Sequence, residues 1–117
     1  MELIGRLEAL VGKEESLFRA QLLREDIARL RKLQELARTA KDAEAFGKSG
    51  MRIGWTQGDA RTHELREPLE RLLAAVYAFE KDAAPEAPIV EAWEALHRAR
   101  MERLVGCLST PVPKPVD

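Results

Sequence analysis

The longest stretch without glycine or proline constrains the fold most strongly. It runs from about Glu14 to Ala45, and its apolar residues recur at three- and four-residue spacing, as on one face of an α-helix. The apolar set is Leu17, Ala20, Leu23, Ile27, Leu30, Leu33, Leu36, Ala37 and Ala40. Aromatic residues make up only 5% of the chain, and Val, Ile and Thr are also scarce, so little is available to build a sheet. The sequence therefore predicts an all-α protein with one long helix at about 14–45.

Three further segments have helical spacing. They are about Glu2–Val11, a segment from Asp59 or Thr62 to about Asp82, and about Ile89–Leu108. Gly12 is a weak terminator, so the first segment could also continue into the long helix. We expect an antiparallel helical bundle of about four segments, forming one domain over residues 1–108.

Two stretches predict irregular structure. A glycine-rich loop is expected at 47–58, because it holds four of the seven glycines. Its Gly-Lys-Ser partly matches a phosphate-binding loop, but Asp42 stands where the first glycine of that motif belongs. We therefore expect no nucleotide cofactor. Residues 109–117 hold three prolines and predict a flexible C-terminal tail.

Composition limits the partners and the compartment. The formal net charge is -1, so the molecule as a whole has no strong attraction for nucleic acid or acidic membranes. The single cysteine, Cys107, permits no intrachain disulfide and favours a reducing compartment. The first residues lack a signal-peptide pattern, and the longest uncharged apolar run, Leu72–Phe79, is too short to span a bilayer. We expect a cytoplasmic protein with no membrane partner.

The first half of the long helix predicts self-association. A helix of 32 residues is about 48 Å long, whereas the segments after it reach only about 30 Å. The short N-terminal segment is expected to bury little of the long helix that the later segments leave exposed. The surface we expect to bind a second copy consists of Leu17, Phe18, Leu22 and Leu23. We therefore expect a homodimer or a higher oligomer.

Catalytic and metal-binding patterns are weak. No nucleophile with a matching base is visible, so we expect no catalytic residue and no cofactor. Glu94 and His97 have the Glu-x-x-His spacing of carboxylate-bridged metal sites. The residues expected opposite them, around Val76, offer no second carboxylate. A metal-binding carboxylate bundle is therefore the weakest of the alternatives, and we expect no metal.

Basic residues on the long helix favour a second alternative. Between Arg19 and Arg52 there are nine Lys and Arg against five Asp and Glu. Arg24, Arg31 and Arg38 recur every seven residues, so they share one side of the helix. Such a row could contact the phosphates of a nucleic acid, or it could pair with glutamates across a helix interface.

The glycine-rich loop carries the remaining candidate contact. Arg52, Ile53 and Trp55 lie between its glycines, and Trp and Arg are the residue types that most often anchor protein interfaces. The loop either folds back on its own bundle or contacts an unidentified protein partner. Together these patterns predict a non-enzymatic protein–protein interaction module, such as an adaptor, an assembly or accessory factor, or an inhibitor. The main alternative is a nucleic-acid-associated accessory protein.

Overall fold

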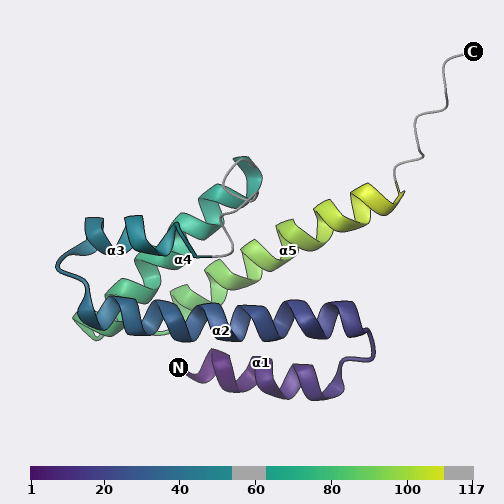
Figure 1. The fold of residues 1–117 in the computed structure, drawn as a ribbon, viewed down its shortest axis with the longest axis horizontal. Coiled ribbons are helices and arrows are strands. Elements are labelled where there is room, and N and C mark those ends of the chain that lie inside the picture. Colours follow the sequence, from purple (N-terminus) through teal and green to yellow (C-terminus); the bar gives the residue numbers. More distant parts are fainter. Residues whose placement is uncertain (54–62, 110–117) are drawn as a thin grey trace, which may run out of the picture.

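The computed structural model describes residues 1–53 and 63–109 (Figure 1), with side chains described over 1–53 and 64–103. Within these ranges the only regular secondary structure is helical, and no strand is present. The helices are α1 (Glu2–Lys13), α2 (Leu17–Thr39), α3 (Ala43–Gly50), α4 (His63–Asp82) and α5 (Ala87–Ser109). The predicted all-α class is confirmed.

The predicted long helix is wrong at both ends, because α2 covers only Leu17–Thr39. At its start, the hydroxyl of Ser16 accepts a hydrogen bond from the backbone N–H of Arg19 and caps the helix. Residues 14–16 therefore separate α1 from α2, and the alternative of one continuous helix is also wrong. The helix α1 continues through Gly12 to Lys13.

A second break divides the predicted long helix near residue 40. Ala40 is extended, and Asp42 caps α3 by accepting a hydrogen bond of 2.8 Å from the N–H of Ala45. The Lys81 ammonium donates to the carbonyl of Arg38 at 3.0 Å and satisfies one of the carbonyls left open where α2 ends. The turn brings Phe46, only 1% exposed, back onto the core. Burial of this phenyl ring favours the break despite the absence of glycine and proline.

The predicted glycine-rich loop is wrong in its first part, since Gly47 and Gly50 belong to α3. Gly50 lies where α3 meets α4, and a Cβ atom there would lie 2.6 Å from Cδ2 of Leu73. Glycine thus permits the close approach of the two helices. The rest of the predicted loop, Gly54–Gly58, lies outside the described residues.

The helices α4 and α5 are neighbours along much of their length (Figure 1). They are joined by residues 83–86, where Ala83 has a φ of 52°. The Glu86 carboxylate accepts a hydrogen bond of 3.0 Å from the N–H of Leu3 and fixes the start of α1 beside this turn. Since α5 extends to Ser109, the predicted tail begins one residue too early, and 110–117 lie outside the described residues.

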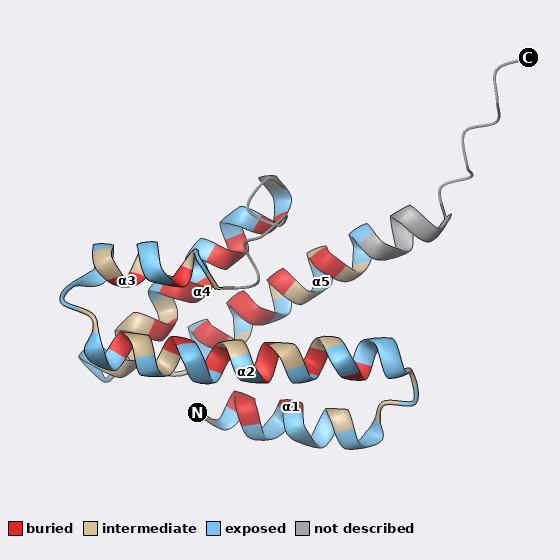
Figure 2. Ribbon diagram, viewed as in Figure 1, coloured by how far each residue is buried: buried red, intermediate tan, exposed pale blue. Residues whose placement is uncertain are grey.

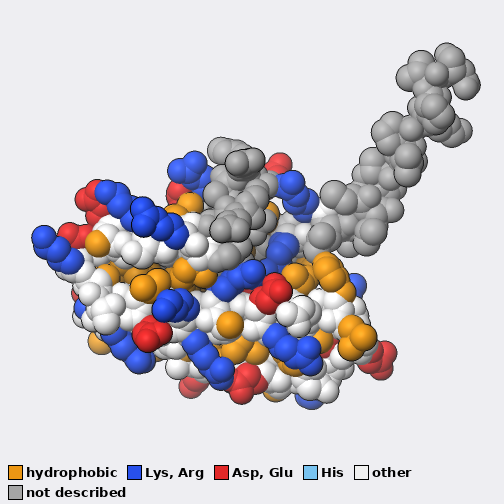
Figure 3. Space-filling model, viewed as in Figure 1, with side chains coloured by type: hydrophobic (Ala, Val, Ile, Leu, Met, Phe, Trp, Pro, Cys, Tyr) orange, Lys and Arg blue, Asp and Glu red, His pale blue; other side chains and the backbone are white. Residues whose placement is uncertain are grey.

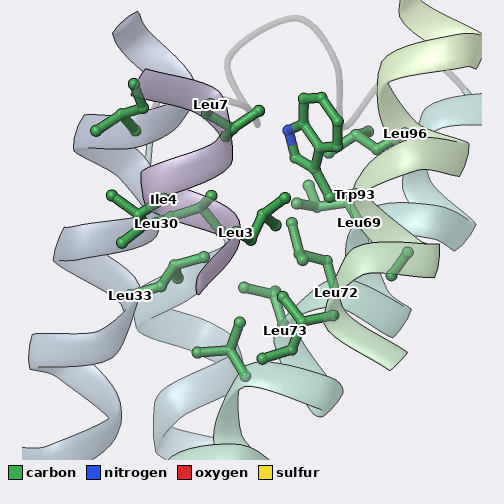
Figure 4. Close-up of a cluster of buried hydrophobic side chains, with 14 of the residues drawn as sticks. Leu3, Ile4, Leu7, Leu30, Leu33, Leu69, Leu72, Leu73, Trp93 and Leu96 are labelled. Atoms are coloured by element: carbon green, nitrogen blue, oxygen red, sulfur yellow. The ribbon is translucent and has the colours of Figure 1, made fainter. Parts of the chain in front are cut away.

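The core lies between α1, α2, α4 and α5, as the buried positions in Figure 2 show. Figure 4 shows its centre, where side chains from these four helices point toward one another. The labelled residues there are Leu3, Ile4, Leu7, Leu30, Leu33, Leu69, Leu72, Leu73, Trp93 and Leu96. The short α1 thus contributes three core residues and covers more of α2 than its length suggests.

Candidate functional site

A buried carboxylate, Asp26, is the centre of the most concentrated group of polar side chains. Asp26 is 0% exposed although it lies on α2 among Leu23, Ile27 and Leu30. It accepts hydrogen bonds from Trp93 Nε1 at 3.0 Å and from Arg100 Nη1 and Nη2 at 2.9 and 2.7 Å. Arg29 donates a further hydrogen bond at 3.3 Å. These donors compensate the cost of removing the charge from water.

Three residues of α5 face this carboxylate because of their spacing. Trp93, His97 and Arg100 are four and three residues apart and share one helix face. The His97 ring stacks on the Trp93 ring, with centroids 4.8 Å apart and planes inclined by 11°. Arg100 Nη2 donates to His97 Nδ1 at 2.8 Å, since a guanidinium can only donate. The proton of the neutral imidazole then belongs on Nε2.

The electrostatic environment of His97 favours its neutral form. Burial lowers the pKa of His97 below its ordinary value of 6.5, and the adjacent Arg100 guanidinium lowers it further. The Asp26 carboxylate opposes this shift, while Arg19 adds to it. A neutral imidazole is consistent with acceptance of the Arg100 hydrogen bond.

The Asp26 cluster is defined as Asp26, Arg29, Trp93, His97 and Arg100, and its hydrogen bonds join α2 to α5. Its carboxylate has no exposed surface and is surrounded by donors, so it cannot reach a substrate. The sequence reasoning missed this cluster. The available signal was a charged residue at a core position of the long helix, between Leu23 and Ile27.

Glu94 and His97, the pair with Glu-x-x-His spacing, lie in different surroundings on α5. Glu94 is exposed, whereas His97 is half-buried and engaged with Arg100 and Trp93. In residues 1–53 and 63–109, as far as side chains are described, no three His, Cys, Asp or Glu side chains gather closely enough to hold a metal ion.

The predicted self-association surface divides into exposed and buried parts. Leu17 is 85% exposed and Phe18 is 59% exposed at the start of α2, and Leu22 is half-buried. Leu23 is only 5% exposed and packs in the core. Figure 3 shows hydrophobic side chains at the surface near this end of α2. We call Leu17 and Phe18 the apolar knob.

The arginine row is largely paired within the chain. Arg31 forms an ion pair with Glu8 of α1, and Arg38 pairs with Glu80 of α4 at 3.3 Å. Both arginines therefore tie α2 to a neighbouring helix. Arg24 lies with Arg31 and Glu8 around a shallow hollow of about 350 Å³. Pairing with glutamates is the second of the two roles that the row predicts.

The predicted partner contact is only partly described. Arg52 is exposed, and Ile53 is half-buried against the core. Trp55 lies outside the described residues.

Comparison of this chain with protein-family models, with curated proteins and with solved structures finds no match. Among the described residues, no helix combines the length and the apolar character needed to cross a membrane.

Proposed function

We propose that this chain is a non-enzymatic helical interaction protein, an antiparallel bundle that self-associates through the apolar knob. The observation that carries the proposal is the 85% exposure of Leu17 beside the 59% exposure of Phe18. Two large adjacent apolar side chains project into water from the first turn of a well-capped helix. Such an arrangement is typical of a contact surface.

The energetics favour a reversible interaction. Full burial of a Leu or Phe side chain contributes roughly 1.5–3 kcal/mol. Association of two molecules costs about 4–15 kcal/mol because translational and rotational freedom is lost. The knob must therefore be buried against an apolar surface of its partner to offset this cost. We expect assembly that depends on protein concentration and shifts toward the monomer on dilution.

The decisive experiment measures mass in solution. The wild-type chain of 13.2 kDa should give at least twice that mass by light scattering at tens of micromolar. Leu17→Glu/Phe18→Glu should give a monomer with unchanged helical circular dichroism, because glutamate is favourable in the first turn of a helix. The control is Gln21→Glu/Ala28→Glu, which adds the same two charges at exposed positions farther along α2. A wild-type chain of monomeric mass would refute self-association.

A nucleic-acid-associated role is the alternative, through Arg24, Arg31 and Arg38. The ion pairs of Arg31 and Arg38 with glutamates compete with phosphate contacts and make this role less favourable. Retention on heparin that falls with salt and is lost on Arg24→Ala would support it.

An unidentified protein partner at Arg52, Ile53 and Trp55 is compatible with self-association, since these residues are far from the knob in the sequence. Alanine substitution there should weaken capture of such a partner without changing the mass of the isolated protein.

A further inference from the structure

An apolar groove lies between α3 and α4. It encloses about 530 Å³, and its walls include Phe46, Met51, Leu73 and Tyr77. The Phe46 and Tyr77 rings are 5.5 Å apart and tilted, and they give the groove an aromatic wall. Its dimensions fall within the range of ligand pockets, which is roughly 300–1,000 Å³.

Small residues open this groove and acidic residues border it. Gly47 on α3 and Ala74 on α4 leave it without bulky side chains, and a Cβ atom at Gly47 would meet no other atom within 4 Å. Glu70 and Asp82 are the exposed acidic residues of its lining, and because Glu70 is already paired with Arg66 at 3.0 Å, Asp82 is the carboxylate that favours an incoming cation. The groove is therefore complementary to an apolar group that has a cation beside it.

We propose that the occupant of this groove is the apolar knob of a second copy of this chain. The inference rests on the self-association proposed above and specifies its geometry. A cavity of roughly 150 Å³ is sufficient for a benzene-sized ring, so the groove has room for the Phe18 ring and the Leu17 side chain together. Arg19, which is exposed and directly follows the knob in the sequence, supplies the cation that Asp82 favours.

The position of the two surfaces determines the kind of assembly. The N-terminal end of α2 and the helix α3 lie at opposite ends of α2 (Figure 1), whose 23 residues span about 35 Å. A knob therefore cannot fill the groove of its own chain. Copies join head to tail, and each new copy presents a free knob at one end and a free groove at the other. Such contacts generate rings or open chains, or a twofold dimer when two antiparallel copies each place their knob in the groove of the other.

A mixing experiment tests this geometry. The knob variant is Leu17→Glu/Phe18→Glu, and the groove variant is Gly47→Gln/Ala74→Gln, which fills the groove from both helices. The control Gly5→Gln/Ala28→Gln makes the same exchanges at two exposed positions on α1 and α2. Sedimentation velocity is recorded for each variant alone and for an equimolar mixture of the knob and groove variants.

Each of these two variants alone should sediment as a monomer, and the control should assemble like the wild type. The mixture should form a heterodimer that grows no further, because the groove variant retains a knob and the knob variant retains a groove. A groove variant that assembles like the wild type, or a mixture that stays monomeric, would overturn the head-to-tail inference and leave self-association intact. A monomeric wild-type chain would overturn both.

A charge exchange provides a second test that does not depend on filling the groove. Asp82→Lys changes an exposed residue and should weaken self-association by roughly two- to fivefold, the scale of an exposed ion pair. A mixture of the Asp82→Lys variant with an Arg19→Glu variant should regain the affinity, because the groove of the first protein and the knob of the second again carry opposite charges. If Asp82→Lys assembles with the wild-type affinity at low salt, Arg19 does not contact the groove and the inference fails.

Discussion

Asp26 and Arg100 are 74 residues apart in the sequence and form a buried two-point ion pair, with Nη1–Oδ1 and Nη2–Oδ2 distances of 2.9 and 2.7 Å. The backbones of α2 and α5 do not pack closely against each other. The long Arg100 and Trp93 side chains therefore span the space between the two helices. This link positions α5 relative to α2 as specifically as direct helix packing would.

Removal of the Asp26 carboxylate should be strongly destabilising. In Asp26→Ala, the Arg100 guanidinium is left buried without a counter-ion, and its Nε already has no hydrogen-bond partner among the described residues. We expect the free energy of unfolding in urea to fall by about 3–5 kcal/mol. Glu25→Ala is the matched control, because Glu25 pairs with the same Arg29 from a partly exposed position and should cost less than about 1 kcal/mol. Equal losses would contradict a structural role of the buried pair.

Trp93→Phe tests the indole contribution separately. Phenylalanine keeps most of the apolar ring but loses the Nε1–H that donates to Asp26. A hydrogen bond to a charged group contributes about 1.5–3 kcal/mol, and we expect a loss of this order in chemical denaturation. In the Asp26→Ala background the same substitution should cost clearly less, because its acceptor is gone. Additive losses would show that the indole acts through packing alone.

The stability of the protein should depend on pH through His97. Its pKa in the folded state lies below the ordinary value of 6.5, so the unfolded chain binds a proton more readily. Stability is therefore complete above pH 6.5 and decreases as the pH falls through that value, until the folded imidazole is protonated as well. His97→Gln should show a weaker decrease in stability between pH 7.5 and pH 5. Identical pH profiles for the two proteins would contradict this prediction, since His63 is present in both.

Gly50 should tolerate no side chain without loss of stability. A Cβ atom there would overlap Cδ2 of the buried Leu73, so Gly50→Ala should destabilise the fold by about 1–3 kcal/mol. Gly5→Ala is the control, because no atom lies within 4 Å of its Cβ position and alanine is the better helix former. It should stabilise the protein by up to about 1 kcal/mol. Thermal unfolding of the two variants should therefore shift in opposite directions.

Helical spacing and composition were sufficient to predict the fold class and the approximate positions of α1, α2, α4 and α5, but not a separate α3. The break at Ala40 was not predictable from glycine or proline, because it depends on tertiary packing of Phe46 and on the Lys81 contact with Arg38. Asp42 is a good N-cap residue in retrospect, but an aspartate within a charged helix carries little local information.

The candidate surfaces were predictable to different degrees. The exposed Leu17 and Phe18 follow from an excess of apolar residues on the long helix. The Asp26 cluster could not be derived in the same way, because its donors Trp93 and Arg100 belong to a helix that sequence spacing does not pair with Asp26. The groove depends on the position of α3, which the sequence placed partly in a loop.

The sequence separation of Asp26 and Arg100 has a consequence for the order of folding events. The helix pairs α1–α2 and α4–α5 each join segments that follow one another along the chain, so their closure requires short loops. The ion pair can form only after both pairs have come together. We therefore expect Asp26→Ala to accelerate unfolding and to leave the refolding rate almost unchanged in stopped-flow measurements. The buried pair then forms late in folding, and it determines how long the molecule stays folded more than how fast it folds.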